Sequence, residues 1–192
     1  MYATSVKNPT FGQNFMNLKS ISFFILFLVT FSTFAQEQQP EGGRQINIVY
    51  GANFTKDEAQ FPGASIFSKD DERQVQFEHQ GADLWCDVAI FYTEENRLKA
   101  IGNIRLQQGD SIEMNSGKMD YDGNTKLAKA WEKVDLTNGQ MTLTTDTLYF
   151  DRENQQAYYN AGGKVVDSAN VLTSKVGTYV MTPKKYQFQR NV

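Results

Sequence analysis

The 192-residue sequence contains one cysteine, one histidine and four prolines. The single cysteine, Cys86, excludes an internal disulfide, so the fold must be stabilised by burial of side chains. The single histidine, His79, supplies neither a histidine cluster for a metal ion nor a convincing Ser-His-Asp set. No glycine-rich phosphate loop stands before a helix. We therefore expect a protein that is not an enzyme and that needs no cofactor and no metal.

Long apolar runs are also scarce, since only residues 21–34 form one. This run has 14 residues, whereas a helix that spans a bilayer needs about 20. Lys19 precedes the run, and Thr33-Phe34-Ala35 follows the pattern of a cleavage site. We predict a signal peptide at 1–35; the alternative is an uncleaved membrane anchor. No cysteine follows the run to carry a lipid, so the predicted product is a soluble exported protein.

The sequence also has no excess of basic residues over acidic residues. Residues 1–35 contain two lysines and no acidic residue, so their removal leaves 17 basic against 22 acidic residues, a net charge of −5. Such a surface repels nucleic acid. We expect no nucleic-acid partner.

What the sequence has in abundance is the pattern of short β-strands. Runs rich in Val, Ile, Thr, Tyr and Phe alternate with turn sequences such as YDGNT, TNGQM and NAGGK. Residues 36–44 are expected to form a flexible leader and residues 57–65 a loop. The remainder, 45–192, predicts one all-β domain with about a dozen strands and no helix longer than two turns.

A repeat of about 30 residues organises this domain. An aliphatic column recurs at spacings of 30, 29 and 29 residues: Leu84, Met114, Leu143 and Leu172. An aromatic column has the same spacings: Phe91, Tyr121, Phe150 and Tyr179. Between these segments lies a second template, Ala-x-Gly-x-aliphatic or a variant of it, which ends at Ile104, Val134 and Val165. Each repeat unit therefore consists of two extended segments joined by turns.

The first segment of each unit changes phase in its middle. Leu84 and Cys86 share one face of a strand, whereas Ala89 and Phe91 fall on the other. A bulge or a corner between the two pairs would turn both inward. We therefore predict two facing antiparallel sheets that share bent strands. The side chains expected to face the interior are Leu84, Phe91, Ile104, Met114, Tyr121, Val134, Leu143, Phe150, Val165, Leu172 and Tyr179.

Cys86 occupies a repeated position for a small, weakly polar side chain, because Ser116, Thr145 and Ser174 stand in the same column. A reactive thiol would need a histidine or a basic neighbour to lower its pKa. His79 lies in an adjacent run without a supporting motif. The sequence favours an inert packing thiol over a catalytic or ligand cysteine.

The run from Gly81 to Gly139, with its recurrent Ala100, Gly102 and Ile104 pattern, resembles the organic-solvent-tolerance (OstA-like) family of lipopolysaccharide-transport proteins. The similarity extends from about Ile46 to the end. It implies a twisted, V-shaped β-jellyroll in the periplasm, associated in some form with the outer membrane. The apolar interior of such a jellyroll carries lipid A acyl chains, which would make the eleven interior residues a lipid-binding trough. The family also implies edge-to-edge stacking with other β-jellyroll transport components.

The resemblance has two departures. Trp131 and Glu132 stand where the family has a small residue and a glycine, and the chain stops at Val192 where family members continue. We expect a fragment or a short form. Residues 186–192 predict a further strand, with Val192 in the column of Val165. We expect this strand to pair with another jellyroll or with strand 46–50 of a second copy, which would form a homo-oligomer.

Two interpretations of the interior columns stay open at this point. They are either a lipid-binding trough or plain core. The alternative function is a structural β-solenoid or a polysaccharide-contacting module at the cell surface, which would carry outward aromatic or polar ladders.

Overall fold

The protein is described by a computed structural model in residues 45–139, 141–182 and 185–189. These residues form fifteen β-strands and no helix, which confirms the expected all-β class. The predicted signal peptide and the leader at 36–44 lie outside the described residues. The expected loop at 57–65 is found, except that Ser65 already begins a strand.

The strands differ in length, and the four longest lie in the middle of the chain. In chain order they are β1 (Asn47–Tyr50), β2 (Asn53–Thr55), β3 (Ser65–Ser68), β4 (Val75–His79), β5 (Ala82–Cys86), β6 (Val88–Tyr92), β7 (Arg97–Gln108), β8 (Ile112–Asp122), β9 (Leu127–Asn138), β10 (Met141–Asp151), β11 (Gln156–Tyr159), β12 (Gly163–Val166), β13 (Val171–Ser174), β14 (Val176–Val180) and β15 (Lys185–Gln189).

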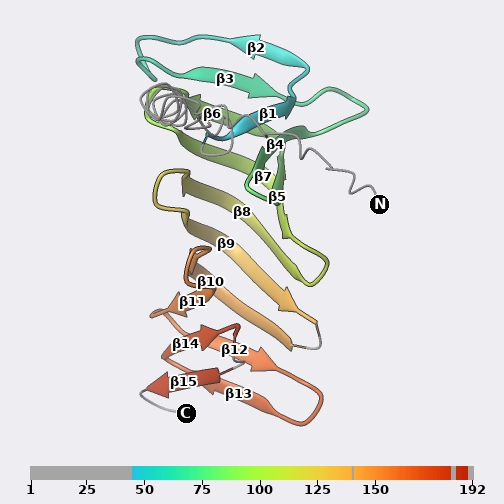
Figure 1. Cartoon of the computed structure of the whole chain (residues 1–192), viewed down its shortest axis with the longest axis vertical. Coiled ribbons are helices and arrows are strands. Elements are labelled where there is room, and N and C mark those ends of the chain that lie inside the picture. Colours follow the sequence, from blue (N-terminus) through green and yellow to red (C-terminus); the bar gives the residue numbers. More distant parts are fainter. Residues whose placement is uncertain (1–44, 140, 183–184, 190–192) are drawn as a thin grey trace, which may run out of the picture. The chain divides into compact units, whose positions relative to one another are not determined.

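The long strands β7 to β10 run side by side and are bent (Figure 1). Their register is interrupted in the middle, for example between Ile101 and Ile104 and between Thr145 and Thr147. The interruption divides the ladder into two sheets. Sheet I has the order β1-β4-β5-β7-β8-β9-β10-β12-β13, and sheet II has the order β2-β3-β6-β7-β8-β9-β10-β11-β14-β15. Each long strand contributes one half to each sheet, as the phase change in the sequence predicts.

The bends combine left-handed backbone with a glycine beside an acidic side chain. In β7, Gly102 has a φ of 80°, and a Cβ there would lie 2.9 Å from the carboxylate of Asp87. In β9, Glu132 itself has a φ of 66°, and the glycine stands opposite in β8, where a Cβ on Gly117 would meet Glu132 at 2.8 Å. The departure at Glu132 therefore leaves the bend intact, because the glycine and the acidic residue have exchanged strands.

The turns on the sheet II side repeat as well. Asp122 and Asp151 each begin a turn and accept hydrogen bonds from backbone N–H groups two or three residues further on. The last residue of each turn, Asn96, Lys126 or Gln155, is left-handed with a φ between 52° and 58°. These turns keep successive units at a spacing of 29 or 30 residues.

One hydrophobic cluster fills the space between the sheets, from Ile46 to Met181. Aromatic rings pack across it: the ring of Phe77 in sheet I lies 6.1 Å from Phe67 and 5.4 Å from Phe91 in sheet II. The two sheets therefore face each other over a shared core, as in a jellyroll.

The strands at the two ends differ slightly from expectation. The predicted strand 46–50 is β1, which begins one residue later and pairs with β4 at the edge of sheet I. The predicted C-terminal strand is β15, which pairs with β14 in sheet II. Val192 lies outside the described residues.

Candidate functional site

The candidate site is the interior between the two sheets. Ten of the eleven predicted interior residues are buried. They are Leu84, Phe91, Ile104, Met114, Tyr121, Val134, Leu143, Phe150, Val165 and Tyr179. Leu172 is only half-buried, because β13 is the edge strand of sheet I and no described strand pairs with its outer side.

The register corrects one column. Val165 pairs with Leu143, which pairs with Leu136. Val134 instead pairs with Thr145, whose other partner is Gly163. Val165 therefore lies level with Leu136. The second template predicted that it would lie level with Val134, and this prediction is wrong. In the third unit a short connection that contains Gly162 separates β11 from β12. Because of this connection, the pairing of β12 with β10 is displaced by two residues from the alignment that the sequence repeat predicts.

Sheet II lines the interior with large and small side chains in alternation. Phe91 pairs with Leu98, which pairs with Tyr121, and the partner of Tyr121 on the next strand is Ala128. Phe150 continues the row between Ala128 and Ala157. Sequence analysis missed the members of this row that lie between the aromatic residues, namely Leu98, Ala128 and Ala157. Strict alternation along β7, β9 and β11 could have identified them.

Sheet I has a corresponding aliphatic row. Leu84 pairs with Leu106, Leu106 with Met114, and Met114 with Leu136. All four side chains are buried, although only Leu84 and Met114 belonged to the predicted set. The interior is therefore apolar across both sheets, without a charged side chain in these two rows.

The small polar column lies at the bends and has a structural role. The hydroxyl of Ser116 donates to the carbonyl oxygen of Lys118 at 3.2 Å, and that of Ser174 donates to Val176 at 3.0 Å. Cys86 is fully buried at the corresponding bend. Burial raises the pKa of its thiol to about 12. Such a thiol is not a nucleophile at neutral pH, which supports the inert packing role.

Opposite the bends, polar side chains close the gap between the sheets; we call this edge the mouth. His79 Nδ1 of sheet I lies 2.6 Å from the hydroxyl of Tyr121 in sheet II. Asn138 Nδ2 donates to the hydroxyl of Tyr179 at 3.1 Å across the same edge. Burial raises the pKa of Tyr121, which therefore stays protonated at neutral pH. The mouth is closed by hydrogen bonds.

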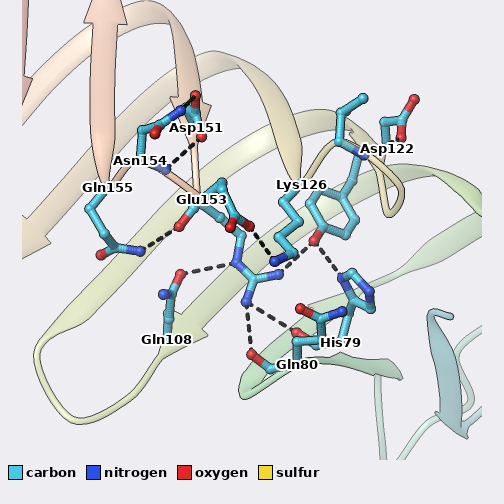
Figure 2. A network of polar contacts seen from close by, with 12 residues as sticks. His79, Gln80, Gln108, Asp122, Lys126, Asp151, Glu153, Asn154 and Gln155 are labelled. Atoms are coloured by element: carbon cyan, nitrogen blue, oxygen red, sulfur yellow. Dashed lines mark hydrogen bonds and ion pairs between the residues drawn. The ribbon is translucent and has the colours of Figure 1, made fainter. Parts of the chain in front are cut away.

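Arg152 is the most extensively bonded residue of the mouth. Its Nε donates to Gln108 Oε1 at 3.0 Å, and its Nη1 donates to the hydroxyl of Tyr121. Its Nη2 donates to the carbonyl oxygens of His79 at 3.1 Å and Gln80 at 3.2 Å (Figure 2). We call these five residues the Arg152 cluster. It connects the turn after β10, in sheet II, to the ends of β4 and β7, in sheet I.

The cavity beneath the Arg152 cluster is small. Its volume is about 10 Å³, enough for about one water molecule. Its walls include Phe77, Leu84, Leu98 and Leu106 from both sheets. An acyl chain does not fit there unless the sheets move apart.

A second depression lies on the outer face of sheet II. It has a volume of about 570 Å³, and no residue of sheet I lines it. Lys99, Lys129, Tyr149 and Tyr158 contribute to it and alternate along their strands with the buried interior residues. The ring centroids of Tyr149 and Tyr158 lie 6.1 Å apart, and Lys129 Nζ lies 5.8 Å from the ring centroid of Tyr149.

The described part of the chain shows no group of three or more His, Cys, Asp or Glu side chains that could hold a metal ion. Asp70, which is followed by Asp71 in the sequence, accepts hydrogen bonds from the backbone N–H groups of Glu72 and Arg73, and so caps a turn. Within the described ranges there is no helix that is long and apolar enough to cross a membrane.

Comparisons with known proteins agree with this architecture. Fifteen chains of solved structures match the protein. One is LptH from Pseudomonas aeruginosa, described as the LptA-homologous periplasmic component of the lipopolysaccharide transport device; it is 12% identical, with a TM-score of 0.53, and the match covers 57% of this chain and 82% of LptH. This likeness shows the fold. No curated protein matches the sequence. A model of the OstA-like protein family matches residues 52–192, and the chain therefore belongs to the OstA-like family.

Proposed function

We propose that this protein carries lipopolysaccharide, or a similar lipid, through the periplasm toward the outer membrane, with the acyl chains held between sheets I and II. The observation that carries the proposal is the single apolar cluster between the sheets, which extends through the described domain from Ile46 to Met181. The likeness to LptH supports the cargo, since LptH is a component of a lipopolysaccharide transport device. Members of the OstA-like family are transport components and not enzymes.

The physical driving force is burial of methylene groups. Each buried methylene contributes about 0.8 kcal/mol, so twelve of them contribute about 10 kcal/mol. The chains would enter by moving the sheets apart at the mouth, because the cavity there is too small for them in the closed state. Breaking the hydrogen bonds of the mouth offsets part of this gain, at about 0.5 to 1.5 kcal/mol for each neutral bond and about 1.5 to 3 kcal/mol for each bond from the Arg152 guanidinium.

Edge strands offer the means of assembly. β1 and β2 lie at one end of the two sheets and β13 and β15 at the other. Ile48, Val49, Phe54 and Val171 on these strands are exposed apolar side chains. Another β-jellyroll component, or a second copy of this chain, would pair with such an edge and extend the apolar interior across the joint.

Photo-crosslinking tests the position of the lipid. A photoreactive amino acid replaces Phe150, which faces the interior, or its neighbour Tyr149, which faces outward. With purified lipopolysaccharide, we expect adducts at position 150 and few at position 149. Saturable uptake of a fluorescent fatty acid, displaced by lipopolysaccharide, provides the affinity. Absence of both the adduct and the uptake would refute the proposal.

A second candidate function is contact with polysaccharide on the outer face of sheet II. The depression with Tyr149, Tyr158 and Lys129 favours it, because tyrosine rings and lysines are suited to sugar rings and acidic sugars. The same experiment discriminates the two functions. Adducts with delipidated polysaccharide at position 149, and none at position 150, would favour the second.

A further inference from the structure

Arg152 is buried and makes no direct ion pair with a described carboxylate. The residue is 5% exposed, and the four acceptors of its guanidinium are an amide oxygen, a hydroxyl and two backbone carbonyls. No described carboxylate lies within 4.0 Å of its guanidinium. Glu78 lines the same cavity, and the charge of Arg152 helps to lower its pKa, but its carboxylate is hydrogen-bonded to Asn47 and to the backbone of Gly81 and not to the guanidinium. Buried cations in proteins are ordinarily paired with an anion.

The repeat does not require a cation at this position. The residues that follow the aromatic column by two positions are Thr93, Gly123, Arg152 and Met181. Their backbone environment recurs, because Gly123, Arg152 and Met181 each donate a backbone hydrogen bond to the last residue of the preceding sheet II turn. Met181 is buried and apolar. The fold therefore accepts an apolar side chain here, and the guanidinium of Arg152 serves another purpose.

The place of Arg152 indicates that purpose. It is bonded to residues of both sheets and must release them before the mouth opens, and most residues that line the cavity directly beneath it are apolar. A guanidinium binds phosphate or carboxylate oxygens more strongly than it binds neutral acceptors, and often with two parallel hydrogen bonds. A ligand with an apolar chain and an anionic headgroup matches both features.

On the basis of the function proposed above, we propose that Arg152 is the specificity-determining residue of the mouth. The anionic headgroup of an entering lipid replaces Gln108, Tyr121, and the carbonyls of His79 and Gln80 as the acceptor of the guanidinium. This exchange removes the hydrogen bonds of Arg152 between sheet I and sheet II while the acyl chain enters between them. Without an anion, opening of the interior breaks the hydrogen bonds of the Arg152 cluster with no replacement acceptor, so a neutral ligand binds more weakly. Arg152 thus couples opening of the interior to the charge of the ligand.

The test compares two ligands that share a chain and differ in charge, dodecyl phosphate and dodecanol, in competition with a fluorescent acyl reporter. We expect the unmodified protein to bind dodecyl phosphate about tenfold more tightly, or better, because hydrogen bonds to charged groups are the stronger ones. Arg152→Gln is expected to bring the ratio close to one, with dodecanol bound as tightly as before or more tightly. The matched control is Arg105→Gln, which removes the same charge from a guanidinium that stacks on Trp85, 3.9 Å from its ring centroid. It should keep the preference.

Each outcome bears on the proposal. An unchanged ratio in Arg152→Gln would overturn it and leave the proposed function standing, provided that both ligands bind. Binding of neither ligand to the unmodified protein would overturn the proposed function and this inference together. Inorganic phosphate alone should not displace the reporter, because the guanidinium is buried; displacement would reveal a free anion site and overturn the coupling to an acyl chain.

Circular dichroism would reveal whether Arg152→Gln is misfolded. If it is, a second variant still tests the proposal. Gln108→Ala removes one neutral acceptor of the guanidinium and keeps the cation. We expect it to bind dodecyl phosphate several-fold more tightly and to retain the preference for the anion. Weaker or unchanged binding of dodecyl phosphate would contradict the exchange of acceptors.

Discussion

Replacement of Cys86 by serine tests how the bends are built. The serine hydroxyls in the equivalent positions donate to the carbonyl oxygen two residues further along, Ser116 to Lys118 and Ser174 to Val176. The hydroxyl of Thr145 lies 3.3 Å from the corresponding carbonyl oxygen of Thr147 and donates to that of Gly162 at 2.7 Å. A serine at position 86 would find the carbonyl of Val88 in the same place. Cys86 is fully buried, so an unbonded hydroxyl there would cost about 1 to 3 kcal/mol. A hydrogen bond contributes about 0.5 to 1.5 kcal/mol in return.

We therefore expect Cys86→Ser to change the free energy of unfolding by less than about 1 kcal/mol, since the two terms nearly cancel. The matched control is Ala89→Ser. Ala89 is equally buried but lies in a regular ladder between β3 and β7, with no bend to present a carbonyl. That variant should lose about 1 to 3 kcal/mol.

Urea unfolding followed by tryptophan fluorescence measures both free energies. The reasoning fails if Cys86→Ser loses more than about 2 kcal/mol, because the bend would then not supply an acceptor. It also fails if Ala89→Ser is as well tolerated as Cys86→Ser.

Three further predictions concern stability. Leu143→Ala should cost about 2 to 5 kcal/mol and Leu172→Ala clearly less, because Leu143 is fully buried and Leu172 is half-exposed at an edge; equal losses in urea unfolding would contradict the assignment of the edge. Lys133→Gly should raise the free energy of unfolding by about 1 kcal/mol, since Lys133 has a φ of 59°; a loss of stability would show that the left-handed bend is not strained. Hydrogen bonds from Asn47 and Gly81 lower the pKa of Glu78, and one from Tyr50 lowers that of Asp70. A carboxyl with a lowered pKa stabilises the fold above its unfolded pKa of about 4, so the unfolding midpoint in urea should stay constant above pH 5 and fall below pH 4. A midpoint that rises on acidification would refute the sign.

The sequence alone determined the all-β class, the period of the repeat and ten of the buried side chains. It could do so because alternation along a strand and the spacing of turns depend on residues that lie within about 30 positions of one another in the chain. The phase change around Cys86 predicted the bend, and the column with Ser116 and Ser174 predicted an inert thiol. The interpretation of Glu132 needed the structure, because its glycine partner is Gly117 on the neighbouring strand.

Only the tertiary structure decided how the interior is closed. Arg152 lies 72 and 73 residues from Gln80 and His79, and 44 residues from Gln108, so no local pattern associates them. In the sequence Arg152 is one charged residue in a turn, where charged side chains are usually solvated. It is buried because the repeats stack and bring the end of β10 in sheet II against the ends of β4 and β7 in sheet I. Packing of distant strands, and not the residue type, turned this arginine inward.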